Sequence, residues 1–137
     1  MLSTMSSLAD GLDVIGDRWS LLVVQALGAG PQRFGELQAH VSGIATNVLV
    51  QRLRQLEQRG LVAATPYSTR PPRFQYSLTD DGRRLGPVLA ALTEWAAHRA
   101  NGELAVHEAC GTPIEMRPWC PTCEQVVDPD AHELHHL

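Results

Sequence analysis

The apolar residues in the first sixty positions recur at helical spacing, in segments that glycine or proline separates. Leu8, Leu12 and Ile15 follow one another at intervals of four and three, which predicts a first helix. Asp17 is a good N-cap for a second helix, whose end is marked by Gly28, Gly30 and Pro31. Four helices are expected in this part of the chain, over residues 3–13, 18–27, 34–40 and about 45–59.

The fourth of these segments has two contrasting faces. At 100° per residue, Leu49, Leu53 and Leu56 fall on one side of a helix. The opposite side carries hydrogen-bonding side chains and almost no acid, namely Thr46, Asn47, Gln51 and Arg54. We therefore expect one face to pack against the core and the other to be free for recognition.

After Gly60 the period of the pattern changes from helical to alternating. Residues 61–67 and 73–79 are expected to form two strands, joined by the stiff basic loop 68–72. Thr79 is expected to cap a last long helix, which Pro87 should kink. This order of elements predicts a mainly α winged helix-turn-helix domain over residues 1–101, with a small β-hairpin as the wing and an extension over 102–137.

Charge is distributed unevenly along the chain. The 137 residues have a net charge of −4, and all 11 basic residues are arginines. Six arginines and two glutamates between Arg33 and Arg73 give that part +4, whereas one arginine and seven acids after residue 99 give the tail −6. The middle of the chain, but not the tail, is therefore suited to a polyanion.

This combination of side chains fits recognition of double-stranded DNA. Asn and Gln suit adenine, and Arg suits guanine or a phosphate. Asn47 and Gln51 are the expected base-contacting residues, while Arg52 is expected to pair with Glu57 or Glu36 instead. The full set of predicted DNA contacts is Arg33, Thr46, Asn47, Gln51, Arg54, Arg70 and Arg73, the last two in the minor groove or on its backbone.

The three cysteines all lie in the tail, where they form a spaced pattern with histidine. His107 precedes Cys110 by three residues, and Cys120 precedes Cys123 by three. Two such pairs suit one tetrahedral structural zinc ion, which would stabilise a segment poor in large apolar residues. A Cys120–Cys123 disulfide and unliganded thiols are the alternatives, and His107 could be replaced as a ligand by His132, His135 or His136.

Several linked motifs resemble the HxlR-type bacterial regulators, relatives of the MarR group. They are LDVIGDRWSLL at 12–22, RFGEL at 33–37, QRLRQLE at 51–57 and PPRFQYSLT at 71–79. The resemblance implies a homodimer joined through its first and last helices. Two positions depart from the family pattern: Ser6 replaces a cysteine often used as a thiol sensor, and Ala45 replaces a capping serine, so that Thr46 could become the cap.

Together these features predict a cytoplasmic, sequence-specific transcriptional regulator, acting as a homodimeric repressor on a palindromic operator. A protein-interaction module that uses the winged helix and the tail is the alternative. An enzyme is not expected, because the sequence has no Ser-His-Asp arrangement, phosphate loop or open metal site. Trp19 and Trp95 are expected to be core or dimer-interface residues, and a small-molecule effector pocket between the dimerising helices is the alternative. No apolar stretch is long enough to span a membrane.

Overall fold

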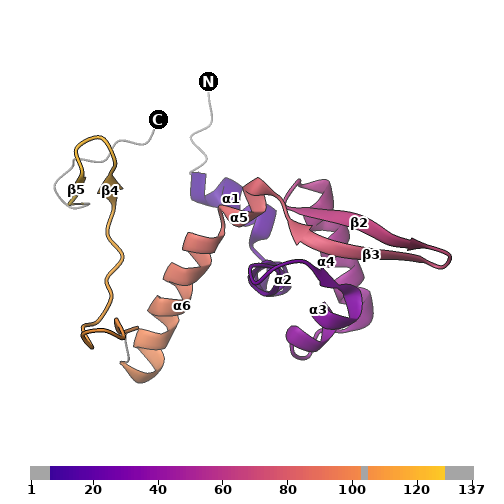
Figure 1. Ribbon diagram of the computed structural model, residues 1–137, viewed down its shortest axis with the longest axis horizontal. Coiled ribbons are helices and arrows are strands. Elements are labelled where there is room, and N and C mark those ends of the chain that lie inside the picture. Colours follow the sequence, from indigo (N-terminus) through magenta and orange to yellow (C-terminus); the bar gives the residue numbers. More distant parts are fainter. Residues whose placement is uncertain (1–6, 103–104, 129–137) are drawn as a thin grey trace. The chain divides into compact units, whose positions relative to one another are not determined.

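The computed structural model describes residues 7–102 and 105–128 (Figure 1). The chain divides into two compact units, Met1–Ala90 and Ala91–Leu137. The expected domain boundary after residue 101 stays a prediction. Ser6, the start of the expected first helix, and the three histidines after residue 131 lie outside the described residues.

The first unit contains the expected helices. The helices α2 and α3 have the predicted bounds, and Asp17 caps α2 by accepting the backbone N–H of Ser20 at 2.9 Å. The helix-turn-helix is formed by α3 and α4, with Gly43 in a left-handed conformation in the turn. The bounds are α1 Ser7–Ile15, α2 Arg18–Leu27, α3 Phe34–His40, α4 Thr46–Gln58 and α5 Asp80–Arg83.

A three-stranded antiparallel sheet follows the order β1-β3-β2, where β1 is Gln32–Arg33, β2 is Val62–Thr69 and β3 is Pro72–Leu78. The short strand β1 was not predicted, because two residues carry no periodic signal. The loop expected over 68–72 is shorter than predicted: Thr69 pairs with Pro72, which leaves only Arg70 and Pro71 at the tip. Pro72 is tolerated because it is the first residue of its strand.

The prediction of one long last helix was wrong. Thr79 caps the separate short helix α5, where its hydroxyl accepts the backbone N–H of Gly82 at 3.1 Å. Gly82 is buried against the Leu61 carbonyl, where a Cβ would come within 2.1 Å of the oxygen. Helix α6 then runs Gly86–Asn101, so Pro87 lies in its first turn, where a missing N–H costs no helical hydrogen bond.

The core of the first unit joins α2, α3 and α4 to the base of the wing. Leu49, Leu53 and Leu56 are buried in it, as the helical periodicity predicts. Leu8 and Leu12 of α1 are exposed, and only Ile15 of the predicted apolar stripe packs against the core. The other buried apolar residues are Val23, Val24, Leu27, Leu37, Val41, Ile44, Leu61, Val62 and Leu78.

The second unit has short hairpins and little interior. Its strands β4, Trp119–Cys120, and β5, Gln125–Val126, pair antiparallel, and Val106 bridges to Pro113. Among the described residues between 91 and 128, none is buried. None of the helices in the described ranges is long and apolar enough to cross a membrane.

Candidate nucleic-acid interface

The outward face of α4 is formed by the residues that the sequence singled out. Thr46, Asn47, Gln51 and Arg54 are all exposed, while the leucines on the opposite face are buried. Because the leucines fix the rotation of the helix, the amide and guanidinium groups must face away from the core. The structure thus brings these four predicted contacts together on one surface.

Helix α4 begins without a side-chain cap. Ala45 is the N-cap residue and has no side chain that could accept a hydrogen bond. Thr46 does not take over the capping role, since it is the first helical residue and its hydroxyl accepts a hydrogen bond from Gln38 Nε2 at 2.7 Å. The role of Gln38, on α3, could not be predicted, because no sequence pattern links it to a residue eight positions away.

Two other arginines, Arg52 on α4 and Arg59 directly after it, contact other groups of the protein. Arg52 Nε lies 3.2 Å from Asp17 Oδ1, and its Nη1 donates to Gln55 Oε1 at 2.8 Å. An intramolecular ion pair for Arg52 was expected, but the predicted partner, Glu57 or Glu36, was wrong. Arg59, at the end of α4, donates to the backbone carbonyls of Asp13 and Val14 at the end of α1.

The Asp17 carboxylate is held in its charged form by these contacts. Burial alone would raise its pKa, but hydrogen bonds from Ser20 and the nearby charge of Arg52 lower the pKa below its ordinary value. Asp17 therefore joins the start of α2 to α4 as well as capping α2.

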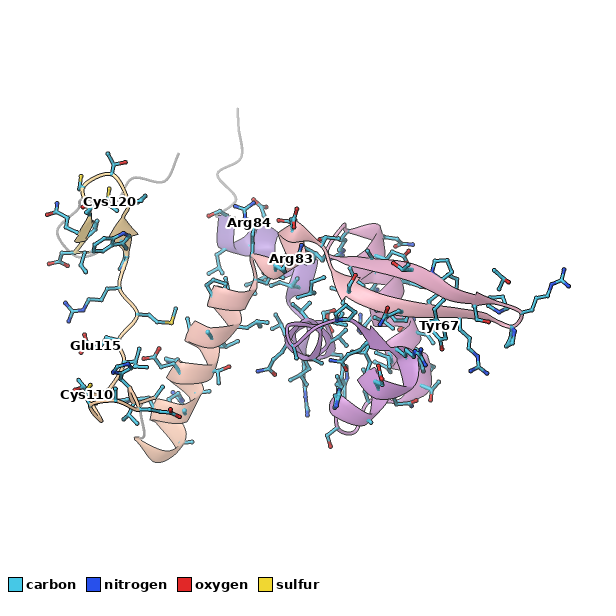
Figure 2. All side chains as sticks on the ribbon, viewed as in Figure 1. Tyr67, Arg83, Arg84, Cys110, Glu115 and Cys120 are labelled. Carbon is cyan, nitrogen blue, oxygen red and sulfur yellow. The ribbon has the colours of Figure 1, made fainter. Side chains whose placement is uncertain are left out.

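The wing carries Arg70 at its tip and Arg73 at the start of β3, both exposed. In the part of the chain that the structure describes, neither forms an ion pair. The register of β2 and β3 shifts between Pro66 and Ser68, and this irregularity is where Tyr67 lies. Figure 2 marks Tyr67 on the wing.

Tyr67 and Arg33 connect the wing to the start of α3. The Arg33 guanidinium lies over the Tyr67 ring, 4.2 Å from its centroid, and the Arg33 backbone N–H donates to Glu36 Oε2 at 2.7 Å. A cavity of about 350 Å³ is lined by Arg33, Tyr67 and Arg73, which puts two of the predicted phosphate contacts beside one opening. Tyr67 was missed, although Pro66 within a strand signals an edge or an irregular position.

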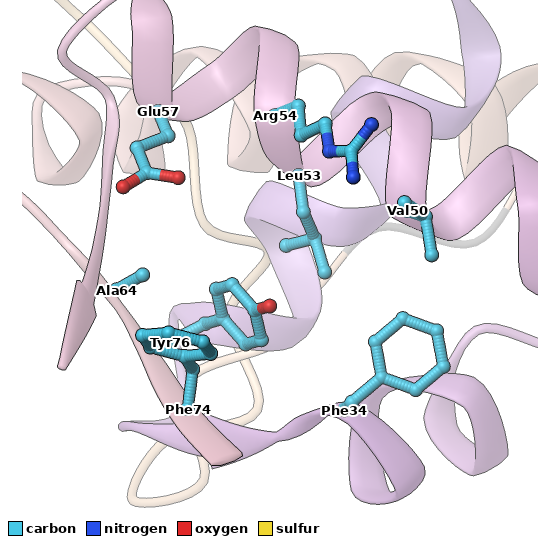
Figure 3. A pocket seen from close by; sticks show the side chains of 8 residues that line it. All are labelled: Phe34, Val50, Leu53, Arg54, Glu57, Ala64, Phe74 and Tyr76. Atoms are coloured by element: carbon cyan, nitrogen blue, oxygen red, sulfur yellow. The ribbon is translucent and has the colours of Figure 1, made fainter. Parts of the chain in front are cut away.

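A second cavity, of about 270 Å³, lies between α4 and the wing (Figure 3). Arg54 and Glu57 line it from α4, facing the aromatic rings of Phe34, Phe74 and Tyr76. Burial raises the pKa of Tyr76, with a further upward contribution from the charge of Glu57 and an opposing one from Arg54. Tyr76 therefore stays a neutral hydroxyl near neutral pH.

The two candidate effector residues differ in their surroundings. Trp19 is half-buried against the core of the first unit, with the Arg18 guanidinium 4.8 Å from its ring centroid. Trp95 belongs to the second unit and is exposed, with the Arg99 guanidinium 5.1 Å from its ring centroid. An effector pocket at these residues stays a prediction.

The four predicted metal ligands form two separate pairs. His107 Nδ1 lies 3.3 Å from Cys110 Sγ, and Cys120 and Cys123 are hydrogen-bonded neighbours. Cys110 and Cys120 are well separated in Figure 2. No group of three or more histidine, cysteine or acidic side chains able to hold a metal ion is present among the described residues.

Known proteins with similar sequences are regulators. The model of the HxlR-like helix-turn-helix family matches residues 14–103. The uncharacterized HTH-type transcriptional regulator YkvN of Bacillus subtilis is 40% identical over 96 residues, which cover 70% of this chain and 81% of YkvN. Rv3095 of Mycobacterium tuberculosis, also named an HTH-type transcriptional regulator, is 35% identical over 123 residues, which cover 90% of this chain and 72% of Rv3095.

A solved structure extends the similarity to nearly the whole chain. The crystal structure of PA1607, whose proposed role is that of a transcription factor, superposes with a TM-score of 0.73 at 32% identity. The match covers 97% of this chain and 96% of PA1607. With the exposed face of α4, the wing and these relatives, the chain belongs to the HxlR-like helix-turn-helix family and is a DNA-binding transcriptional regulator rather than an enzyme.

Proposed function

We propose that the protein acts as a cytoplasmic homodimeric repressor that binds a palindromic operator, with α4 of each subunit in the major groove. The main support is the contrast between the arginines near α4. Arg52 and Arg59 form intramolecular contacts with polar groups of α1 and α2, whereas Arg54 lies with Asn47 and Gln51 on the exposed face. These three side chains can donate to or accept from base edges or phosphates.

In this proposal, the residues divide into base and phosphate contacts. Asn47 and Gln51 contact base edges, and Arg54 contacts a base or a phosphate. Thr46, which Gln38 holds through its hydroxyl oxygen, keeps its own hydroxyl hydrogen free to donate to a phosphate. Since Ala45 offers no cap, the first N–H groups of α4 are also open to a phosphate oxygen.

The wing supplies the second set of contacts. Arg70 at the tip enters the minor groove, and Arg73 and Arg33 hold the adjacent backbone. The stacking of Arg33 on Tyr67 supports this role, because it restricts the guanidinium while leaving its N–H groups able to donate.

A dimer is supported by apolar side chains that remain exposed on two helices. Leu8, Leu12 and Val14 are exposed on α1, and Val88, Leu92 and Trp95 are exposed on α6. Exposed apolar side chains clustered on single helices are typical of protein interfaces. Binding of such a dimer over a promoter would block transcription, which is why we favour a repressor.

Selection of bound DNA from random oligonucleotides tests this function. We expect an inverted repeat whose half-sites lie about one helical turn, 10–10.5 base pairs, apart. Affinity for the selected DNA should fall by orders of magnitude between about 50 and 200 mM salt, because each phosphate contact releases counterions. Failure to select any sequence, or an affinity indifferent to salt, would instead favour the protein-interaction module.

A further inference from the structure

The tail contains two turns, one with a histidine and a cysteine and the other with two cysteines. In the first, Cys110 and Gly111 both direct their backbone N–H groups to the His107 carbonyl, at 3.2 and 2.7 Å. The His107 N–H in turn donates to the Thr112 carbonyl at 2.9 Å, which closes the turn. This network leaves the His107 ring and the Cys110 sulfur side by side at the surface.

The second turn joins β4 to β5. It carries two free thiols, that of Cys120, which is half-buried, and that of Cys123, which is exposed. The strand pairs Trp119–Val126 and Cys120–Gln125 hold the two ends of this turn together.

The two turns share a less common backbone feature. The residue directly after each donor pair is left-handed: Gly111 has a φ of +69° and Glu124 a φ of +53°. Glycine adopts this conformation freely, but glutamate does so rarely. Each turn therefore ends on a residue with a positive φ, although the second has no glycine at that position.

The rest of the tail offers the hairpins almost no other stabilisation. Val106, Ile114, Met116, Trp119 and Val126 are all exposed, and no described residue of this unit is buried. A segment of this size without a buried core usually depends on a metal ion or disulfides for its fold. The His107–Cys110 pair cannot form a disulfide, so a metal ion is the one ligand that uses both pairs.

We propose that His107, Cys110, Cys120 and Cys123 together bind one structural Zn²⁺ in a tetrahedral site. One nitrogen and three sulfur donors form a closed set typical of structural zinc. The pairs stand apart in the structure, and the segment between them contains no helix and no strand of its own before Trp119. Zinc therefore draws the two turns together and orders the exposed apolar side chains around them. The hydrogen bonds that hold the ends of the intervening segment, from Ile114 N–H to the Ala105 carbonyl at 2.7 Å and from Val127 N–H to the Pro118 carbonyl at 2.9 Å, rearrange as the metal ion binds.

Titration of the full, fully reduced and untagged chain with Co²⁺ tests the site, because tetrahedral thiolate-bound Co²⁺ absorbs visible light. We expect thiolate charge-transfer and tetrahedral d–d bands that saturate at about one metal ion per chain and disappear on addition of Zn²⁺. Cys110→Ser and Cys120→Ser should each abolish or shift these bands. His98→Ala, which removes a histidine outside both turns, should leave them unchanged.

Three results would overturn the proposal. The first is the absence of charge-transfer bands, and the second is saturation at one metal ion per two chains. The third is a spectrum that survives His107→Ala but is lost when His132, His135 and His136 are all changed to Ala. Salt-dependent DNA binding by the cysteine variants is the folding control, since the core that positions α4 lies in the first unit. Loss of metal with retained DNA binding separates this proposal from the proposed function.

Discussion

Identical residue types near α4 have opposite roles, and their angles around the helix determine which role each has. Arg54 lies on the exposed face, whereas Arg52 reaches Asp17 of α2. Helical periodicity alone predicts that Arg54 faces outward and that Arg52 lies beside the core. The partner of Arg52 could not be predicted, since Asp17 is far away in the sequence and was already assigned as the cap of α2.

At this scale, Gln51→Ala should relax base preference at one position of each half-site. An amide that binds a base edge with two hydrogen bonds contributes about 1–3 kcal/mol of discrimination against the wrong base. The measurement is competition binding with operators substituted at each position. Gln25→Ala, which removes an exposed glutamine from α2, is the matched control and should change nothing. An unchanged profile for Gln51→Ala would mean that this face does not contact the bases.

At the scale of elements, α4 is fixed in the first unit by polar contacts near its middle and at its C-terminal end. Near its middle, Arg52 pairs with the cap of α2, and at its end Arg59 binds the last carbonyls of α1. These contacts orient the helix without using its exposed face. They depend on tertiary packing, and for this reason the sequence predicts the helices but not how they are joined.

Asp17→Ala should destabilise the first unit by about 0.5–2 kcal/mol, since it removes the cap of α2. Asp17→Asn, which can still cap, should cost less. The native pKa of Asp17 is lowered, so its ion pair stabilises fully above the ordinary aspartate pKa of about 3.9 and is lost as pH falls through the native value. Urea unfolding at a series of pH values should therefore show a smaller loss of stability at acid pH in Asp17→Asn. Equal acid sensitivity of both proteins would contradict this role.

The wing is a second element with a separate prediction. Arg70→Ala should weaken binding to all sequences alike and reduce the slope of log affinity against log salt by about one unit, because one phosphate contact is lost. Arg117→Ala in the tail changes net charge equally but lies on the acidic unit, where it pairs with Glu115. If both variants have the native slope, the wing does not contact DNA.

At the scale of the whole molecule, the sequence predicts the fold class because its hydrophobic residues recur at regular helical and strand spacings. Contacts between residues far apart in the sequence could not be predicted in this way. Gly82 of α5, for example, packs against the Leu61 carbonyl, a contact that no local pattern encodes. The cavities beside Arg54 and Arg33 likewise depend on how the wing stands against α3 and α4. The outward residues of α4 were predictable because a single buried leucine row fixes them.

Dimerisation through α1 is a prediction for the whole molecule. Leu12→Glu should shift the protein toward monomer in sedimentation velocity and weaken binding to the full operator far more than to one half-site, because a charge opposes burial of that face. Val106→Glu is a matched control, since Leu12 and Val106 have the same exposed fraction of 53% but Val106 lies in the tail. A Leu12→Glu protein that sediments as the native protein does would place the subunit contact elsewhere.

Methylation interference on the selected operator tests most directly whether the exposed face of α4 and the wing contact the DNA. Dimethyl sulfate modifies guanine N7 in the major groove and adenine N3 in the minor groove, and both atoms are acceptors at base edges. We expect N7 methylation inside both half-sites to block binding, with N3 methylation interfering only at the flanks that the wing reaches. Interference confined to the minor groove, or none at either atom, would contradict a recognition helix at α4.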